Sequence, residues 1–250
     1  MLRKTEKPVS LSSPPSNIIK KIPTGLAPRS HSFFARITDA KTTASAAFYL
    51  FPPAQPPYSN SIMRITGGQA RGIPLQLPKR GEIRPATDYL RAAVFSSLGP
   101  LVASARVLDV FAGTGAYGLE ALSRGAQSAC FLEKNTAAIA AIRANLQSVQ
   151  KACAPRAFSS EVVTTDALRW IPPAATTFDL VFCDPPWALW EKEAPLLFAK
   201  LATCLAPDAC IILEGPGEFS PPIPANWTMQ RHLAKGKNQP AALILRPDCP

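Results

Sequence analysis

The sequence predicts an α/β fold in which a doubly wound, mainly parallel sheet of seven strands ends in an antiparallel pair. Apolar strand-like runs alternate with helical segments over residues 101–215, two further runs close the chain, and a glycine-rich turn follows the first run. Ligands in such sheets bind outside the carboxyl ends of the strands, so acidic residues at those ends mark the expected site. These acids are Asp109, Glu133, Asp166 and Asp184.

The individual elements follow from apolar periodicity and from breaker residues. The strands are short runs rich in Val, Ile, Leu and Phe, and the longest helix is Ala-rich, with its larger apolar residues on one face. The expected strands are 107–111, 129–133, 161–165, 178–183, 209–214, 227–232 and 241–246, and the expected helices are 116–124, 136–150, a short one from 166 and 195–205.

Composition limits the class of protein. The 250 residues suffice for one sizeable core and an appendage, and the net charge of +10 suggests an anionic partner. No apolar run has the length of a membrane span, and the six cysteines form no CxxC pair or metal-ligand spacing. We therefore expect a cytoplasmic protein with free thiols and no metal.

Residues 1–62 differ from the rest of the chain. They hold eight basic and two acidic residues, are rich in Pro and Ser, and have little periodicity, so we expect them to be disordered. Three origins are open: upstream sequence included by an early start codon before Met63, a basic RNA-binding arm, or an organelle transit peptide. The remaining chain divides into an expected N-terminal hairpin and helix at 63–100 and a doubly wound domain at 101–250.

The segment from Met63 predicts a hairpin followed by a helix, and both carry basic residues. Two short strands surround a Gly-rich turn, with Arg64 and Arg71 among the basic residues. Arg84, Asp88 and Arg91 then cluster at the start of a helix. This cluster has two open interpretations, namely binding of an anion or internal ion pairing.

The glycine-rich turn is the second landmark. Gly113, Gly115 and Gly118 match the GxGxxG pattern of dinucleotide sites, and Glu133 follows at the distance of a ribose-binding acid. Asp109, however, stands four residues before the first glycine, where a pyrophosphate over the turn would make a carboxylate unfavourable. The carboxylate favours a cofactor with a positively charged amino group and no phosphate, namely S-adenosylmethionine.

The stretch FDLVFCDPPW, residues 178–187, reads as a buried strand that ends in a carboxylate, two prolines and an aromatic ring. The prolines fix the backbone after Asp184, at the sheet edge where α/β enzymes place their chemistry. Further along the same edge, Asp166 is expected to accept from an adenine amino group or to cap the helix that follows it.

Together these segments resemble the class I methyltransferases, and more closely the RsmD-type 16S rRNA guanine-N2 methyltransferases. The resemblance extends from Met63 to about Arg246 and rests on MRITGG..RG.PL.LP, RPATD..R..VFSSL, LDVFAGTGAYGLEALSRGA, FLEKN, FDLVFCDPPW and PANW. Because Asp-Pro-Pro-aromatic motifs also occur in DNA adenine methyltransferases, the hairpin and RPATD segments favour the rRNA enzymes. The chain departs from the family pattern at Tyr89, Ala92 and Trp187, where a basic residue, an acidic residue and Phe or Tyr are usual.

The resemblance implies an enzyme with S-adenosylmethionine as cofactor and 16S rRNA or the small ribosomal subunit as partner, and we expect a monomer because no additional oligomerisation element is visible in the sequence. The Asp184 carboxylate and the Pro185 carbonyl would accept the hydrogens of a guanine N2 amine, while Trp187 stacks on the extruded base. The implied residues are Asp184, Pro185, Pro186 and Trp187 for catalysis, Asp109, Phe111, Gly113, Gly115, Gly118, Glu133, Asp166 and Ala167 for the cofactor, and Arg64, Arg71, Arg84 and Arg91 for RNA.

Other functions remain open from the sequence. Within enzymes the alternative is a methyltransferase acting on DNA or on another amine. Outside that class, the glycines alone permit a NAD(P)-binding oxidoreductase, and the basic surface permits a non-catalytic ribosome-assembly factor.

Overall fold

The structure, a computed structural model, describes residues 62–78, 88–186, 189–218, 220–234, 236 and 239–248, apart from the side chain of Glu191. All of these belong to the second of two compact units into which the chain divides, Tyr58–Pro250. The prediction of a disordered extension over residues 1–62 concerns residues that, apart from Ile62, lie outside the described ranges.

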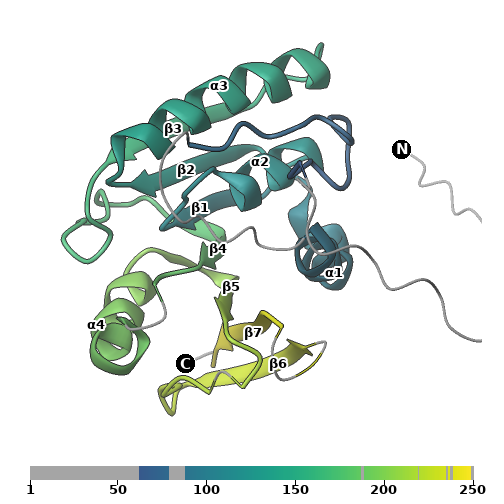
Figure 1. The fold of residues 1–250 in the computed structure, drawn as a ribbon. Helices are drawn as coiled ribbons and strands as arrows, with labels where there is room; N and C mark the ends of the chain where they lie inside the picture. The colour runs from purple at the N-terminus through teal and green to yellow at the C-terminus, as the bar shows by residue number, and fades with distance from the viewer. Residues whose placement is uncertain are drawn as a thin grey trace, which may run out of the picture. The chain divides into compact units, whose positions relative to one another are not determined.

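A seven-stranded sheet forms the centre of the fold (Figure 1). The strand order is β3-β2-β1-β4-β5-β7-β6, with parallel pairing from β3 to β5 and antiparallel pairing of β7 with both β5 and β6. This arrangement confirms the predicted fold class. The strands are β1 (Arg106–Val110), β2 (Ser128–Glu133), β3 (Ser159–Thr164), β4 (Phe178–Cys183), β5 (Leu205–Gly215), β6 (Trp227–Ala234) and β7 (Ala241–Pro247).

Helices cover both faces of the sheet and enclose two cores (Figure 1). The first core joins the sheet to α1, α2 and α3, and the second joins it to α4. Alternate residues of the central strands serve the two cores, as the pleat requires: Leu180 and Phe182 face the first, and Val181 faces the second. The helices are α1 (Asp88–Leu98), η1 (Gly99–Val102), α2 (Ala116–Ser123), α3 (Thr136–Cys153) and α4 (Trp190–Ala202).

The structure differs most from the sequence prediction at three elements. The connection after β3 is a turn at residues 167–169 rather than a short helix. Helix α4 begins at Trp190, before Pro195, because the buried Trp190 indole anchors its first turn by donating to the carbonyl of Glu214. Strand β5 begins at Leu205, because a register shift near Phe178 lets β5 pair with β4 over a longer distance.

The N-terminal segment, residues 62–78, forms a looser hairpin than predicted. One antiparallel bridge joins Arg64 to Pro74, and backbone bonds link Met63 with Leu75 and Ile65 with Ile73, so the segment has no regular strand ladder. Its buried apolar side chains, Met63, Ile65, Ala70 and Leu75, belong to the first core. Residues 62–78 and α1 therefore share a core with the sheet they adjoin.

Among the described residues, we find no helix that is both long and apolar enough to cross a membrane.

Candidate active site

The glycine turn between β1 and α2 depends on its glycines for different reasons. Gly113 and Gly115 have φ angles of +55° and +77°, in the left-handed region that favours glycine. Gly118 is required for packing, because a Cβ there would lie 2.4 Å from an atom of the Phe131 ring. A side chain at Gly113 would instead project into open space, with its nearest neighbour at 3.9 Å. The turn thus packs tightly against the sheet and stays open on its outer side.

Glu133 fixes the turn from the neighbouring strand. Its carboxylate accepts the N–H of Gly113 at 2.8 Å and the N–H groups of Lys134 and Asn135, each at 2.8 Å. Strand pairing places Val110 beside Leu132, so Glu133 stands at the carboxyl end of its strand, next to the start of the turn. Whether this carboxylate also accepts from ribose hydroxyls stays a prediction.

Asp109 lies beneath the turn. Its carboxylate accepts the N–H of Gly118 at 2.9 Å, and the residue is 4% exposed. Burial raises the pKa of Asp109 to about 8, because the Gly118 hydrogen bond offsets only part of the desolvation and the charge of Glu133 opposes ionisation. The predicted contact between Asp109 and a cofactor is not tested by this geometry, but its structural role in holding the turn is clear.

Asp166, for which the sequence predicts either a contact with adenine or a capping role, caps the turn that follows β3. It accepts the N–H of Leu168 at 3.0 Å and pairs with Lys134 at 3.0 Å, and these two interactions lower its pKa. The capping alternative is therefore the one found, with the adenine contact still a prediction. Its neighbour Ala167 is buried in the second core. Phe111, also assigned to the cofactor, packs against the same core with a φ of +60°, which is unusual for a bulky residue.

Asn145 is a structural residue that the sequence interpretation missed. This buried side chain of α3 donates to the carbonyls of Thr114 and Gln76, both at 3.2 Å, and accepts the N–H of Gln76 at 2.7 Å. It thereby joins the glycine turn to the N-terminal segment. The sequence feature that could have indicated this role is an Asn placed among the apolar and Ala positions of an amphipathic helix.

The Asp184 motif begins directly after β4. The N–H of Asp184 lies 3.5 Å from the carbonyl of Val110, Pro185 is buried, and Pro186 is exposed and accepts the N–H of Leu189 at 2.8 Å. Strand pairing aligns Val110 with Cys183, so Asp184 and the glycine turn share one edge of the sheet. Trp187, the predicted stacking residue, lies outside the described residues.

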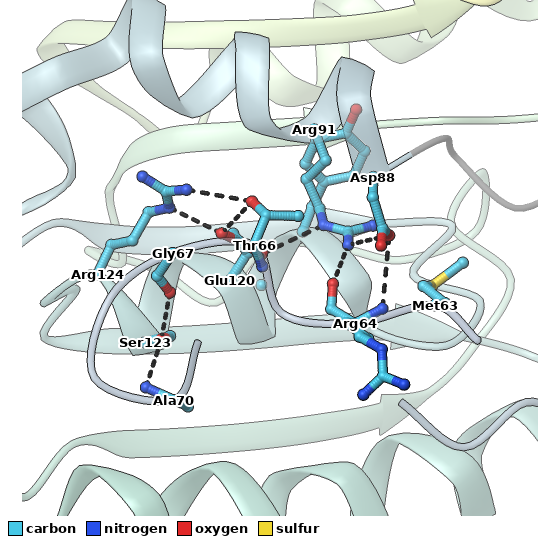
Figure 2. A network of polar contacts seen from close by, with 12 residues as sticks. Met63, Arg64, Thr66, Gly67, Ala70, Asp88, Arg91, Glu120, Ser123 and Arg124 are labelled. Atoms are coloured by element: carbon cyan, nitrogen blue, oxygen red, sulfur yellow. Dashed lines mark hydrogen bonds and ion pairs between the residues drawn. The ribbon is translucent and has the colours of Figure 1, made fainter. Parts of the chain in front are cut away.

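The structure corrects the prediction made for Arg91. Its side chain is fully buried, and its guanidinium pairs with Asp88 at 2.7 Å and Glu120 at 3.3 Å and donates to the carbonyl of Arg64 (Figure 2). A buried, internally paired guanidinium is not available to an RNA phosphate, so its assignment to RNA binding is wrong and the internal-pairing alternative is the one found. Arg64 and Arg71 are exposed. Arg84 lies outside the described residues.

Glu120 is the centre of this network and was not predicted from the sequence. Its fully buried carboxylate accepts the N–H and the hydroxyl of Thr66, both at 2.7 Å, in addition to Arg91 and the guanidinium of Arg124 at 2.8 Å (Figure 2). The residue lies in α2 between Leu119 and Ala121, both fully buried. A charged residue among apolar neighbours was the available signal, but two of its three partners, Thr66 and Arg91, lie 54 and 29 residues away in the chain.

The strand order, the glycine turn and the acids along one sheet edge define a class I methyltransferase fold. The chain belongs to the family described as "Conserved hypothetical protein 95", whose model matches residues 63–243. It is 35% identical to ribosomal RNA small subunit methyltransferase D of Escherichia coli K12 over 176 residues, 70% of this chain and 86% of the relative. The Haemophilus influenzae protein of the same name is 30% identical and covers 73% and 93%.

Solved structures agree with this assignment. The Escherichia coli methyltransferase yhhF is 35% identical, with a TM-score of 0.63 and coverage of 75% of this chain and 99% of that one. The ribosomal protein L11 methylase of Lactobacillus delbrueckii subsp. bulgaricus, at 16% identity, shares the fold with a TM-score of 0.53 and coverage of 72% and 87%.

Removing the Glu120 carboxylate should destabilise the fold strongly. Glu120→Ala leaves the buried Arg91 guanidinium with less compensation, and breaking a buried ion pair in this way costs about 3–5 kcal/mol. Urea denaturation followed by circular dichroism measures the loss. The matched control is Glu161→Ala, which removes an exposed carboxylate from β3 and should change stability by less than about 0.5 kcal/mol. Equal losses in the two variants would contradict the assigned role of Glu120.

Asp109 should make the protein less stable as the pH rises. With a pKa of about 8 in the folded protein against 3.8 in the unfolded chain, the native state holds a proton that unfolding releases. This contribution is fully present below pH 4, is lost between about pH 4 and pH 8, and amounts to about 1.4 kcal/mol for each pKa unit. Asp109→Asn keeps an acceptor for Gly118 and removes the titration.

The measurement is the unfolding free energy of both proteins at a series of pH values. The stability of Asp109→Asn relative to the natural sequence should rise from pH 4 to pH 8 and then level off. A difference that is constant with pH would show that Asp109 does not titrate in this range.

Proposed function

We propose that this protein transfers a methyl group from S-adenosylmethionine to the N2 amine of a guanine in 16S rRNA. The observation that carries the proposal is the placement of the Asp184-Pro185-Pro186 segment on the same sheet edge as the glycine turn with its two acids, Asp109 and Glu133. Two relatives that share at least 30% of their residues with this chain are named ribosomal RNA small subunit methyltransferase D, which supports an rRNA substrate.

The residues of the turn fit S-adenosylmethionine. The space beyond Gly113 is open to a ligand, and the buried acid Asp109 lies under the turn, where a cationic ligand would favour its charged form. Glu133 can add ribose hydroxyls to the backbone donors it already binds, and Asp166 and Ala167 border the proposed adenine side. When bound, the cofactor supplies a methyl group on a positively charged sulfur.

The Asp184 segment serves the nucleophile. The lone pair of a guanine N2 amine is delocalised into the ring, so the amine is a poor nucleophile. A carboxylate at Asp184 and the carbonyl of Pro185 accept its two hydrogens and favour a more tetrahedral nitrogen, whose lone pair then points outward. The prolines keep these acceptors rigid. Most of the acceleration is assigned to positioning, which can contribute up to about 7–11 kcal/mol.

Exposed arginines of the N-terminal segment are assigned to the RNA backbone. Arg64 lies near the glycine turn, since its neighbour Met63 contacts the Thr114 hydroxyl through sulfur at 3.6 Å. Arg71 lies at the far tip of the hairpin, beside the C-terminal end of α2, where Ser123 bonds Ala70. The Arg64 guanidinium donates to the carbonyl of Gly72 at 3.3 Å, so it lies beside the residue that follows Arg71, and the two exposed arginines belong to one part of the hairpin surface. We expect the enzyme to act as a monomer without a metal ion.

Asp184→Ala should abolish methylation while leaving the affinity for S-adenosylmethionine nearly unchanged. The variant removes an acceptor for the amine but no contact assigned to the cofactor. Methyl incorporation into small ribosomal subunits from a strain lacking the enzyme measures activity, with mass spectrometry of the rRNA to locate N2-methylguanine, and isothermal titration measures affinity. Retained activity would refute the role of Asp184.

The same binding and methylation assays, applied to the natural sequence, separate the alternative functions. Tight binding of NADPH without binding of S-adenosylmethionine indicates an oxidoreductase. Methylation of DNA but not of rRNA indicates a DNA enzyme, and subunit binding without methyl transfer by the natural sequence indicates an assembly factor. Each of these outcomes contradicts the proposal.

Replacing Arg64 and Arg71 together with Gln should weaken RNA binding and its dependence on salt. Each arginine that contacts a phosphate contributes about one unit to the slope of log affinity against log salt concentration. Fluorescence anisotropy of a labelled 16S rRNA fragment at several salt concentrations gives the slope. Arg231→Gln, on the exposed edge strand β6, removes one positive charge elsewhere and serves as the control for the loss of a single charge. An unchanged slope in the double variant would exclude both arginines from the RNA surface.

A further inference from the structure

A buried polar pair, Tyr117 and Glu214, lies outside every role assigned above. The Tyr117 hydroxyl donates to the Glu214 carboxylate at 2.6 Å, and both side chains are buried. Tyr117 is the second residue of α2, directly after the glycine turn, and Glu214 is the last residue but one of β5. The pair thus joins the start of the helix beside the cofactor turn to the strand beside the Asp184 motif.

Strand pairing places Glu214 next to Asp184. Cys183 of β4 is aligned with Leu213 of β5, so the next residues of these parallel strands, Asp184 and Glu214, follow side by side. Burial first, then the charges of Glu214 and Asp184, raise the pKa of the Tyr117 hydroxyl. The hydroxyl therefore stays protonated and remains a donor between the two acids.

The ring of Tyr117 also holds the end of β4. It stacks on Phe182 with ring centres 4.9 Å apart and an interplanar angle of 17°. Phe95 of α1 packs against the same Phe182 ring at 5.3 Å. Since Phe182 is two residues before Asp184, these contacts fix the strand that carries the catalytic segment.

Glu214 also reaches the other side of that segment. Its backbone carbonyl accepts the indole N–H of Trp190 at 3.3 Å, at the start of α4. Within the segment, the N–H of Leu189 bonds the carbonyl of Pro186 at 2.8 Å. The Tyr117 ring therefore holds the chain before Asp184, and Trp190 holds it after Pro186. Glu214 bonds both Tyr117 and Trp190.

The ionisation of Glu214 depends on its buried surroundings. Burial raises the pKa of the Glu214 carboxyl, whereas the hydrogen bond from Tyr117 and the positive charge of Arg91 lower it. The Arg91 guanidinium itself pairs with Glu120 and Asp88, so the hydrogen-bond partner of the Glu214 carboxylate is the Tyr117 hydroxyl.

From these contacts we propose that Tyr117 and Glu214 are positioning residues for methyl transfer, which set the Asp184 carboxylate and the Pro185 carbonyl relative to the cofactor turn. The inference rests on the proposed function. The link is direct, because Tyr117 belongs to α2, whose N-cap is Gly115, and its hydroxyl and ring contact the two strands on which the catalytic edge depends. A shift of this pair moves the acceptors without removing any group that touches the cofactor.

The test is Tyr117→Phe, which removes one hydroxyl and keeps the ring stacked on Phe182. Single-turnover methylation of the small ribosomal subunit at saturating S-adenosylmethionine should fall at least tenfold. The dissociation constant for the cofactor and the KM for the subunit should each stay within threefold. A rate within twofold of the natural sequence, or a loss explained by weaker cofactor binding, overturns the inference.

Glu214→Gln supplies the conservative variant. Its amide oxygen still accepts from Tyr117, so it should retain a larger share of the single-turnover rate than Tyr117→Phe. A rate as low as that of Tyr117→Phe would show that the hydrogen bond is not what positions the segment, and would overturn the inference.

Asp179→Asn is the matched control. Asp179 lies at the opposite end of β4 and pairs with Arg106 at 2.8 Å, so its replacement weakens the same strand away from the catalytic edge. Asp179→Asn should lower the melting temperature and leave the single-turnover rate unchanged. If it lowers the rate as much as Tyr117→Phe does, the effect of Tyr117→Phe comes from general weakening of the strand, and the inference is overturned. The failure of the proposed function gives a different result. In that case the natural sequence itself methylates no rRNA, whereas failure of the inference gives equal rates for the natural and variant enzymes.

Discussion

The buried carboxylate of Glu120 is the interaction on which the arrangement of the active edge depends. An unpaired carboxylate in the interior would be prohibitively costly, so Glu120 requires its donors from Thr66, Arg91 and Arg124. These donors come from the N-terminal segment, α1 and α2 (Figure 2). One acid thus determines how three pieces of chain fit together, and α2 in turn carries the glycine turn at its start and Tyr117 one residue further on.

The backbone of the glycine turn is held by side-chain hydrogen bonds, which accept from its N–H groups or donate to one of its carbonyls. Glu133 and Asp109 hold the turn from below through the N–H groups of Gly113 and Gly118. Asn145 holds it from α3 through the carbonyl of Thr114. The acids at the strand ends are therefore structural supports of the edge as well as candidates for ligand contact.

The sequence predicted those parts of the fold and site that depend on local patterns. The sheet, the glycine turn and the acids at strand ends follow from apolar runs and breakers a few residues apart. The burial of Arg91 and the roles of Glu120, Asn145 and Glu214 did not follow, because each of them has a partner 29 to 97 residues away that local patterns do not reveal. A charged side chain looks solvent-exposed until its distant partner is known. The positive φ of Phe111 was likewise hidden, since no glycine marks it.

The long sequence separation within the Tyr117–Glu214 pair has a consequence for how the protein is made. The chain leaves the ribosome from its N-terminus, so the glycine turn and α2 emerge 97 residues before the acid that completes their contact. Pairing of β1 with β4 also spans about 70 residues, a non-local topology that slows folding. The glycine turn is thus synthesised well before the strand that it contacts through Tyr117, and this contact forms only after the first five strands of the sheet have been synthesised.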